Sequence, residues 1–173
     1  MSSRFSEEQT LIRETAQSFA REQLAPFAAA WDKEATFPRD AVNALGELGF
    51  MGMLVPPEYG GAGTDHISYV LALIEIAAGD GSCSTIMSVQ NSLVCSPILN
   101  YGTDEQKETY LKPLASGELL GCFCLTEPSA GSDASALEMK AKKEGDHYIL
   151  NGSKQFISTG KNADIAVGTL QFP

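Results

Sequence analysis

The sequence predicts an α + β protein, in which an all-α domain over residues 1–115 is followed by strands over residues 116–173. Two observations carry this prediction. Apolar residues recur at helical spacing behind capping residues through roughly the first two thirds of the chain. Beyond Gly117 the pattern changes to short apolar or alternating runs separated by glycine-containing turns, which is typical of strands.

Capping boxes mark two of the expected helices. Ser6 and Gln9 can each satisfy a free backbone N–H at a helix start, and Thr103 and Gln106 repeat this arrangement. The helix that starts at Ser6 is expected to continue to about Phe27. Its apolar residues recur at helical spacing: Ile12, Ala16, Phe19, Ala20 and Phe27.

Three further helices are expected between these two, at about residues 38–48, 66–78 and 82–100. Pro38 suits a first helical turn, and the helix behind it is expected to bury Val42, Leu45 and Leu48. The proline- and glycine-rich residues 56–63 form a predicted loop. The last helix, opened by the second capping box, is expected to end before Pro113.

Four strands are expected, at residues 119–125, 139–143, 147–150 and 153–158. The first is a continuous apolar run, short enough for a buried strand. Turns at residues 144–146 and at Asn151–Gly152 separate the other three. The second turn is a strong hairpin signal, because Asn and Gly both tolerate a positive φ.

The composition excludes several classes of protein. A net charge of −10 argues against a nucleic-acid or anionic-membrane surface, which needs clustered Lys and Arg. The most apolar stretch, residues 70–78, is too short to span a membrane and contains Glu75. The first residues contain neither an apolar signal core nor an Arg-rich transit segment, so a cytoplasmic location is expected.

The four cysteines are interpreted as buried, reduced thiols rather than as a metal or disulfide site. No Cys-x-x-Cys pair occurs, and the two histidines, His66 and His147, are isolated. Cys122 and Cys124 are two residues apart, which predicts that they share one face of a strand.

The most informative segment, residues 124–136, directly follows the first apolar strand. Gly131 allows a ligand to approach the backbone closely, and the N–H groups beside Ser132 can surround a phosphate. Pro128 stiffens the turn, and the Thr126 hydroxyl can reach a heteroatom of a ring. Taken alone, the segment also fits an ordinary turn between two strands.

Residues 155–160 form a second candidate segment. Strand alternation predicts Phe156 and Ser158 on one face and Ile157 on the other. A ring beside a hydroxyl can stack on a flat heterocycle and hydrogen-bond to its edge. The alternative is a phenylalanine in the core with an exposed serine beside it.

In this order and at this spacing, the two segments resemble those of the acyl-CoA dehydrogenase family. Residues 124–136 match the family's signature, and residues 151–158 look like its second flavin segment. Parts of the helical region are similar as well, at residues 5–27, 55–61 and 101–107, and the resemblance reaches about Val167. It implies an N-terminal helical domain followed by the first strands of a β-barrel-like domain, truncated before the C-terminal helical bundle.

The resemblance implies an FAD-dependent oxidoreductase that makes an α,β-double bond in an acyl-CoA thioester, in fatty acid or amino acid catabolism. In the family a carboxylate removes the α-proton, and the β-hydrogen leaves as hydride to FAD. An electron-transfer flavoprotein then accepts the electrons. For the full-length protein the resemblance implies a homo-oligomer, specifically a homotetramer.

The same resemblance implies FAD-binding residues in both segments: Phe123, Cys124, Leu125, Thr126, Gly131, Ser132, Phe156, Ile157 and Ser158. Leu125 and Thr126 are expected at the isoalloxazine edge, and Ser132 near the pyrophosphate and the bound CoA. Phe156 is expected to cover one face of the ring, and Ser158 to hydrogen-bond near N5. Many relatives have Trp in place of Phe156 and Thr in place of Ser158, and both changes keep the function.

The acyl tail is expected to lie against Thr85 and Val89, with Met87 as a further candidate. No catalytic base is assigned within the chain. In the family it is a glutamate, expected here beyond Pro173, and Glu127 suits loop structure better than proton abstraction. The chain as given is therefore predicted to be inactive alone.

Three alternatives stay open. An acyl-CoA oxidase or a flavin monooxygenase of the same fold would share both segments and differ in how oxygen reaches the reduced ring. A non-catalytic fragment is the third alternative, either inert or docking onto full-length subunits through the open edge of its sheet.

Overall fold

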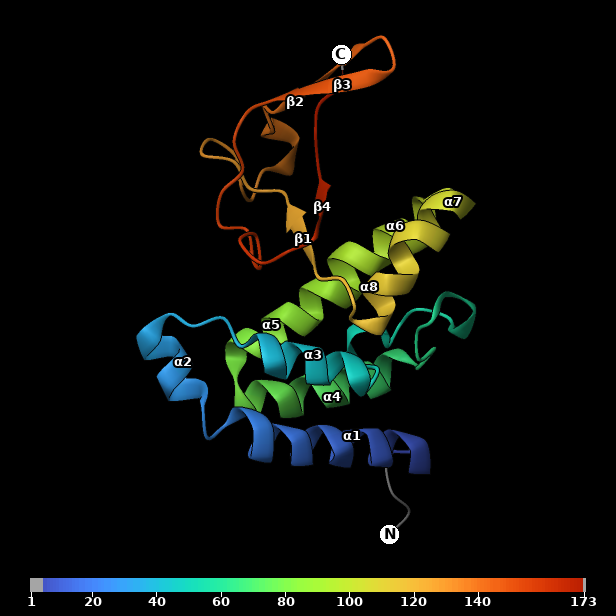
Figure 1. The fold of residues 1–173 in the computed structure, drawn as a ribbon, viewed down its shortest axis with the longest axis vertical. Helices are drawn as coiled ribbons and strands as arrows, with labels where there is room; N and C mark the ends of the chain where they lie inside the picture. The colour runs from blue at the N-terminus through green and yellow to red at the C-terminus, as the bar shows by residue number, and fades with distance from the viewer. Residues whose placement is uncertain (1–4, 173) are drawn as a thin grey trace.

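The computed structural model describes residues 5–172 and has a helical part followed by a β part, as predicted (Figure 1). The helical segments up to the first strand are α1 (Glu7–Phe19), η1 (Ala20–Leu24), α2 (Ala28–Glu34), α3 (Arg39–Glu47), η2 (Phe50–Gly52), η3 (Pro57–Tyr59), α4 (His66–Gly79), α5 (Gly81–Ser88), η4 (Val89–Cys95), α6 (Ser96–Tyr101), α7 (Asp104–Gln106), η5 (Lys107–Leu111) and α8 (Lys112–Ser116). Helices α1 to α5 lie in the lower half of Figure 1 and α6 to α8 rise on the right, whereas the strands and their connecting loops lie above α3 and α5.

The β part contains two small sheets. Its elements are β1 (Gly121–Cys124), the short helix η6 (Ala134–Ala136), β2 (Lys140–Glu144), β3 (His147–Asn151) and β4 (Ile165–Gly168). Strands β1 and β4 run parallel near the helices, whereas β2 and β3 form an antiparallel hairpin farther away (Figure 1). Gly145, with a φ of +65°, lies in the hairpin turn. The first three predicted strands are therefore confirmed.

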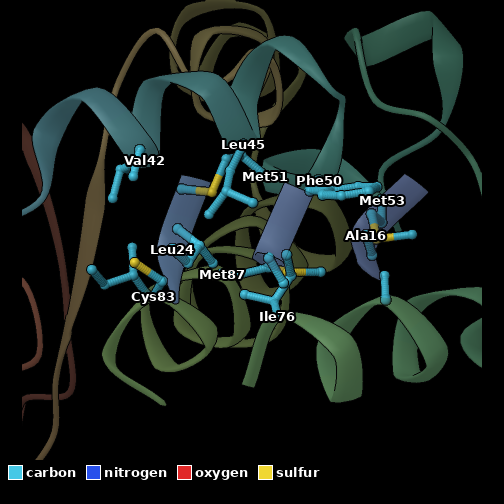
Figure 2. Packing of buried hydrophobic residues seen from close by; sticks show 14 of the residues in the cluster. Ala16, Leu24, Val42, Leu45, Phe50, Met51, Met53, Ile76, Cys83 and Met87 are labelled. Atoms are coloured by element: carbon cyan, nitrogen blue, oxygen red, sulfur yellow. The ribbon is translucent and has the colours of Figure 1, made fainter. Parts of the chain in front are cut away.

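A hydrophobic core joins the helices of the first part (Figure 2). Ala16 of α1, Leu24 of η1 and Met87 of α5 are completely buried in it. Figure 2 shows Val42 and Leu45 of α3 pointing toward Leu24 and Met87. The burial of these apolar side chains is the main stabilising contribution to the helical part.

Both predicted capping boxes are present. The Ser6 hydroxyl accepts from the Gln9 N–H at 3.1 Å, and the Gln9 side chain accepts from the Ser6 N–H at 3.0 Å. The same two bonds join Thr103 and Gln106, at 3.2 and 2.9 Å. These bonds satisfy backbone donors that no helical partner can satisfy, and so determine where α1 and α7 begin.

The helix predicted to reach Phe27 ends earlier, with η1 at Leu24. Pro26 lacks an N–H and cannot continue the helix. Phe27 is 48% exposed and stacks on Trp31, with 5.7 Å between the ring centroids. Trp31 belongs to α2, a helix that the sequence analysis does not predict.

Helix α3 buries Val42 and Leu45 as predicted, but not Leu48. Leu48 caps the C-terminal end of α3 and is 42% exposed, because the chain turns at Gly49, which has a φ of +76°. Pro38 is the residue before α3 rather than part of its first turn.

The helix that starts at Thr103 passes Pro113 and ends at Ser116, so the predicted end before Pro113 is wrong. The π-helical turn η5 comes shortly before Pro113, and the π-helical turn η4 comes shortly before Pro97. A π turn is wider and shifts the acceptor carbonyl by one residue. In both places it therefore accommodates a residue that has no N–H to donate.

Residues 153–158 do not form the predicted strand. Phe156 and Thr159 have φ values of +57° and +63°, which an extended strand excludes. The predicted hairpin at Asn151–Gly152 is wrong as well, since β3 pairs only with β2 among residues 5–172. Phe156 and Ser158 therefore do not share a strand face.

A buried glutamine joins the helical part to β1. Gln90 of η4 is completely buried; its amide donates to the carbonyls of Leu114 and Leu119 at 2.8 and 2.9 Å. Its side-chain oxygen accepts from the Gly121 N–H at 2.9 Å. Around it, apolar side chains of β1 and β4 pack against a second cluster of buried residues: Val55, Val89, Val94, Cys95, Leu111, Leu114 and Ala115.

Glu75, which interrupts the most apolar stretch, joins α4 to α1. Its carboxylate accepts from Arg13 Nε at 2.7 Å and from Gln17 Nε2 at 3.0 Å. The hydrogen bond from Arg13 holds the pKa of Glu75 below its ordinary value. Within residues 5–172, no helix has the length and apolar character to span a membrane.

Candidate functional site

The first candidate segment begins on β1. Phe123 and Cys124 are half-buried there, in register with Val167 and Gly168 of β4. The Sγ atoms of Cys122 and Cys124 lie 3.8 Å apart, which confirms that both residues share one strand face. Burial raises the pKa of the Cys122 thiol to about 11, so this thiol is protonated at neutral pH.

All four cysteines are free thiols, as predicted, and burial raises the pKa of both Cys83 and Cys95 to about 12. Cys124 is half-buried rather than buried. In the part of the chain that the structure describes, no group of three or more His, Cys, Asp or Glu side chains is placed to bind a metal ion.

A tight turn follows β1 at Glu127 and Ala130. The N–H of each of these residues donates to the carbonyl of the other, at 2.8 and 3.2 Å, with Pro128 between them. Gly131 comes next, and a Cβ atom there would have only Thr126 Cγ2 near it, at 3.8 Å. The backbone at Gly131 is therefore accessible to a ligand.

Ser132 and Asp133 lie in the exposed loop after Gly131. The Asp133 carboxylate accepts from the hydroxyl and the N–H of Ser135, at 2.5 and 3.1 Å. These hydrogen bonds hold the pKa of Asp133 below its usual range. The carboxylate thus serves its own loop, while Ser132 stays exposed.

The second candidate segment lies against the first. The Gln155 N–H donates to the Thr126 carbonyl at 2.9 Å, and the Gln155 side chain donates to the Glu127 carbonyl at 3.2 Å. The Thr159 hydroxyl donates to the Gly121 carbonyl at 2.8 Å. Both ends of the segment are therefore bound to β1 or to the turn that follows it.

Phe156 lies between these two connections in an unusual conformation. Its φ of +57° is left-handed, which is uncommon for a bulky residue, and its ring is 87% exposed. Backbone strain combined with an exposed aromatic ring is typical of a functional site. The alternative in which Phe156 packs in the core is wrong. Ile157 is half-buried and Ser158 is exposed.

A buried ion pair connects the two segments in the interior of the β part. Lys154 Nζ lies 2.8 Å from Glu127 Oε1, and the exposed fractions of the two side chains are 8% and 4%. The Glu127 carboxylate also accepts from the N–H groups of Glu138 and Met139, at 2.6 and 3.0 Å. The hydrogen bond from Lys154 and those from the backbone hold the pKa of Glu127 below its usual range. Glu127 is thus part of the loop structure, as the sequence analysis predicts.

The residues predicted to contact an acyl tail differ in their exposure and in the part of the molecule against which they pack. Thr85 is exposed on α5, and its hydroxyl donates to the Gly81 carbonyl of its own helix at 3.0 Å. Val89 belongs to the second buried cluster, against which Phe123 of β1 packs. Met87 is completely buried in the core of the helical part. The structure therefore brings Val89, and not Met87, toward the first candidate segment.

Three residues that build this site are not among those predicted from the sequence: Lys154, Thr159 and Gln90. The opposite charges of Lys154 and Glu127, one in each segment, were a usable signal for a contact between them. Thr159 and Gln90 carry no comparable signal, because each bonds to backbone groups far away in the sequence.

The arrangement suits a large ligand with a flat ring and phosphate groups. The exposed Phe156 ring provides a flat apolar surface, and Gly131 provides accessible backbone. The hydroxyls of Thr126 and Ser132 belong to the adjoining loop, where they can donate to ring heteroatoms or phosphate oxygens. FAD combines these features, so the residues present fit this cofactor.

Known protein families provide an independent comparison. Residues 6–118 match the family model of the acyl-CoA dehydrogenase N-terminal domain, and residues 122–171 match that of the acyl-CoA dehydrogenase middle domain. The chain belongs to the acyl-CoA dehydrogenase family. The match extends beyond Val167, where the resemblance seen in the sequence ended, to Gln171.

Two curated relatives of this family member illustrate the similarity. A 3-(aryl)acrylate reductase of Clostridium sporogenes is 47% identical over 160 residues, which are 92% of this chain and 42% of the relative. A mitochondrial short-chain specific acyl-CoA dehydrogenase of Rattus norvegicus is 45% identical over 157 residues, which are 91% of this chain and 38% of the relative. The chain thus spans about two fifths of the length of these relatives.

Solved structures of the family have the same fold over nearly the whole chain. A glutaryl-CoA dehydrogenase from Mycobacterium smegmatis in complex with FADH2 has a TM-score of 0.93 at 38% identity, over 97% of this chain and 43% of that one. A structure reported for the electron transferring flavoprotein of Acidaminococcus fermentans has a TM-score of 0.92 at 45% identity, over 97% and 44%.

Proposed function

We propose that this acyl-CoA dehydrogenase family member takes part in the FAD-dependent α,β-dehydrogenation of an acyl-CoA thioester and contributes FAD-binding residues. The exposed, left-handed Phe156, held beside the Thr126–Ser132 loop, is the observation that supports this most directly. The glutaryl-CoA dehydrogenase structure that holds FADH2 supports the choice of cofactor.

Each candidate residue has a role that its chemistry suits. Phe156 would cover one face of a bound flavin ring, with Ile157 beside it, and Ser158 could donate a hydrogen bond near N5. Phe123, Cys124, Leu125 and Thr126 would hold the ring edge, while Gly131 and Ser132 would hold the pyrophosphate and the CoA. FAD would supply the acceptor for the hydride that leaves the β-carbon. A donor near N5 stabilises the charge that the reduced ring develops, by about 0.5–1.5 kcal/mol.

The substrate, partner and assembly belong to the same proposal. Thr85 and Val89 contact the acyl tail, and Val89 already lies in the cluster next to β1. An electron-transfer flavoprotein accepts the electrons, which the neighbouring Acidaminococcus structure supports. The boundary between the two domains lies at residues 115/116. The protein assembles as a homotetramer and acts in fatty acid or amino acid catabolism.

A cytoplasmic location stays part of the proposal. The name of the rat relative places that protein in mitochondria, so the comparison with it does not decide the compartment.

The described acids nearest to the two segments serve structure rather than proton abstraction. Glu127 is paired with Lys154, Asp133 binds Ser135, and Asp164 Oδ2 accepts from the Leu120 N–H at 2.9 Å. The base of the reaction is therefore proposed to lie beyond Pro173. The 173-residue chain alone is expected to bind FAD without oxidising an acyl-CoA.

A second candidate function is the reduction of an acrylate-type double bond, because one relative at 47% identity is a 3-(aryl)acrylate reductase. Both candidates need the same flavin-binding segments and differ in the direction of electron flow. Chemically reduced flavin on the protein that is reoxidised by an aryl acrylate, and not by an enoyl-CoA, would favour this second candidate.

The deciding experiment is to purify the chain and to record its visible absorption before and after adding FAD. Binding is then measured by the quenching of flavin fluorescence. The expected result is saturable binding of one FAD per chain, with a shift of the visible absorption spectrum of the flavin. A chain that is folded by circular dichroism but leaves the spectrum and the fluorescence of FAD unchanged would contradict the proposal for these residues.

A further inference from the structure

The buried pair of Lys154 and Glu127 connects more of the chain than an ordinary loop contact does. We propose that these two residues are positioning residues, which hold the two flavin-binding segments at a fixed separation and in a fixed register. This inference rests on the proposed FAD site, since it assigns the groups that shape that site without contacting the cofactor.

Lys154 comes just before the second segment and reaches back to the first. Its Nζ donates to the Leu125 carbonyl at 2.9 Å as well as to Glu127 Oε1 at 2.8 Å. A weaker contact at 3.5 Å joins it to the Thr169 hydroxyl just after β4. One ammonium group therefore joins the end of β1, the turn after it and the chain beyond β4.

Glu127 extends these connections to the next strand. Its carboxylate accepts from the N–H groups of Glu138 and Met139, immediately before β2, at 2.6 and 3.0 Å. Charge-assisted hydrogen bonds of this kind are shorter and stronger than neutral ones. The Glu127 carboxylate thus closes the loop that contains Gly131 and Ser132, because it extends from the first residue of the loop and binds the backbone at the other end.

No strand pairing fixes the position of the second segment, because residues 152–164 form no strand. Gln155 is bound to the carbonyls of Thr126 and Glu127, and the Thr159 hydroxyl is bound to the Gly121 carbonyl. Asp164 is bound to Leu120 at the far end, and Lys154 adds the only ion pair between this segment and the first one in the described part of the chain. A one-residue shift of this segment would separate the Lys154 ammonium group from the Glu127 carboxylate and leave two buried charges without an opposite charge. That outcome is strongly unfavourable, so the pair selects a single register.

The register matters because Phe156 lies two residues after Lys154. With Lys154 bound to the Leu125 carbonyl and Gln155 bound to the Thr126 carbonyl, the backbone that leads into Phe156 is held next to the first segment. The backbone strain at Phe156 persists only where neighbouring contacts determine it on both sides. The ion pair supplies that restraint on the N-terminal side, and Thr159 supplies it on the other.

Three variants of the full 173-residue chain test this proposal. Lys154→Met removes the ammonium group and keeps much of the side-chain volume. The double variant Glu127→Gln with Lys154→Met removes both charges, so no unpaired charge is left in the interior. Lys112→Met is the matched control, because Lys112 pairs with Glu108 on an exposed helix face. Folding is checked by circular dichroism for each variant.

Two readouts are then compared. Hydrogen exchange of the Gln155 amide, measured by NMR without FAD, reports the register of the second segment. Titration with FAD reports the shape of the site. In the folded double variant we expect at least about tenfold faster exchange at Gln155 and at least about tenfold weaker FAD binding, with unchanged exchange in α1 and α4. The control is expected to match the unaltered chain in both readouts.

A double variant that keeps both the Gln155 protection and the FAD affinity would overturn the proposal. So would a double variant that unfolds throughout, since the pair would then be a general stabilising contact. If the unaltered chain binds no FAD, the proposed function fails, and the exchange data still decide whether the pair positions the segment. The two failures are therefore distinguishable.

Discussion

At the scale of single residues, Phe156 shows most directly how function conflicts with local preference. A phenylalanine in the left-handed region is destabilised by about 1–2 kcal/mol relative to its usual conformations, and its exposed ring recovers none of this through burial. Selection for stability alone would place a glycine here. The position is explained if the ring is needed by a ligand.

Replacing Phe156 tests this conflict. The substitution Phe156→Gly is expected to raise the free energy of unfolding by up to about 1 kcal/mol, because glycine tolerates a positive φ. The same substitution is expected to weaken FAD binding at least about tenfold, since the flat surface is lost. Urea denaturation and FAD titration measure the two effects.

Phe156→Trp is the matched comparison for this substitution. It keeps a flat ring at the same strained position, so FAD binding is expected to persist without a gain in stability. If Phe156→Gly bound FAD as tightly as Phe156→Trp, the ring would have no part in the site.

At the scale of elements, α1 and α7 begin where side chains satisfy backbone donors, and two helical runs pass Pro97 and Pro113 after the π turns η4 and η5. The hydroxyl of Thr103 satisfies the N–H of Gln106, which has no partner within the helix. The same helical run continues through the π turn η5, passes Pro113 and ends at Ser116. Its start is therefore determined by a local cap, and its end at Ser116 coincides with the left-handed Gly117, whose φ of +80° terminates the helix.

The substitution Thr103→Ala removes this cap. We expect it to lower the free energy of unfolding by about 1 kcal/mol, a typical value for a lost Ser or Thr cap. Thr103→Ser, which keeps the hydroxyl, is expected to lose much less. Equal losses in the two variants, measured by thermal unfolding, would assign the effect to the methyl group instead.

The contact between α1 and α4 predicts a dependence of stability on pH. The Arg13 side chain lowers the pKa of Glu75 in the folded chain below its ordinary value of 4.5. Because the folded pKa is the lower one, this stabilisation is fully present above the ordinary value and is lost as the pH falls through the folded pKa.

Arg13→Gln is therefore expected to be less stable than the unaltered chain at pH 7, by roughly 1 kcal/mol, because Arg13 is half-exposed. The difference is expected to shrink as the pH is lowered below the ordinary pKa of 4.5 and through the lower folded pKa of Glu75. Urea denaturation at several pH values measures it. A difference that stayed constant over this range would mean that Arg13 acts through packing of its side chain rather than through the charge of Glu75.

At the scale of the whole molecule, Gln90 is the polar link between the helical and β parts. Its side chain makes three hydrogen bonds with backbone groups on either side of the junction. The apolar clusters around it are not directional, so the amide is what aligns β1 with η4. The candidate site on β1 therefore depends on a residue in the helical part.

Gln90→Leu tests this link with a side chain of similar size. We expect the substitution to lower the free energy of unfolding by about 2–4 kcal/mol, because it leaves buried backbone groups without partners. Gln23→Leu, at an exposed position of η1, is expected to change stability by less than about 0.5 kcal/mol. A comparable loss in both variants would show that the amide contacts of Gln90 contribute little.

The sequence by itself determined the features that depend on neighbours along the chain. Capping boxes at Ser6 and Thr103, the hairpin turn at Gly145 and the apolar strand before Thr126 all follow from local hydrogen bonding and periodicity. The two candidate segments were recognisable through their resemblance, in order and spacing, to those of the acyl-CoA dehydrogenase family, because each is a continuous run of residues; taken alone, each also fits an ordinary turn or core packing.

Only the tertiary structure determines how these segments of the chain contact one another. The left-handed Phe156 and the loop in place of a strand at residues 153–158 have no local signal that outweighs strand propensity. They result from contacts such as Lys154 with Glu127, between residues that are far apart in the sequence. Such contacts form only once folding has excluded water from both partners. The periodicity of apolar residues along the chain therefore does not predict them.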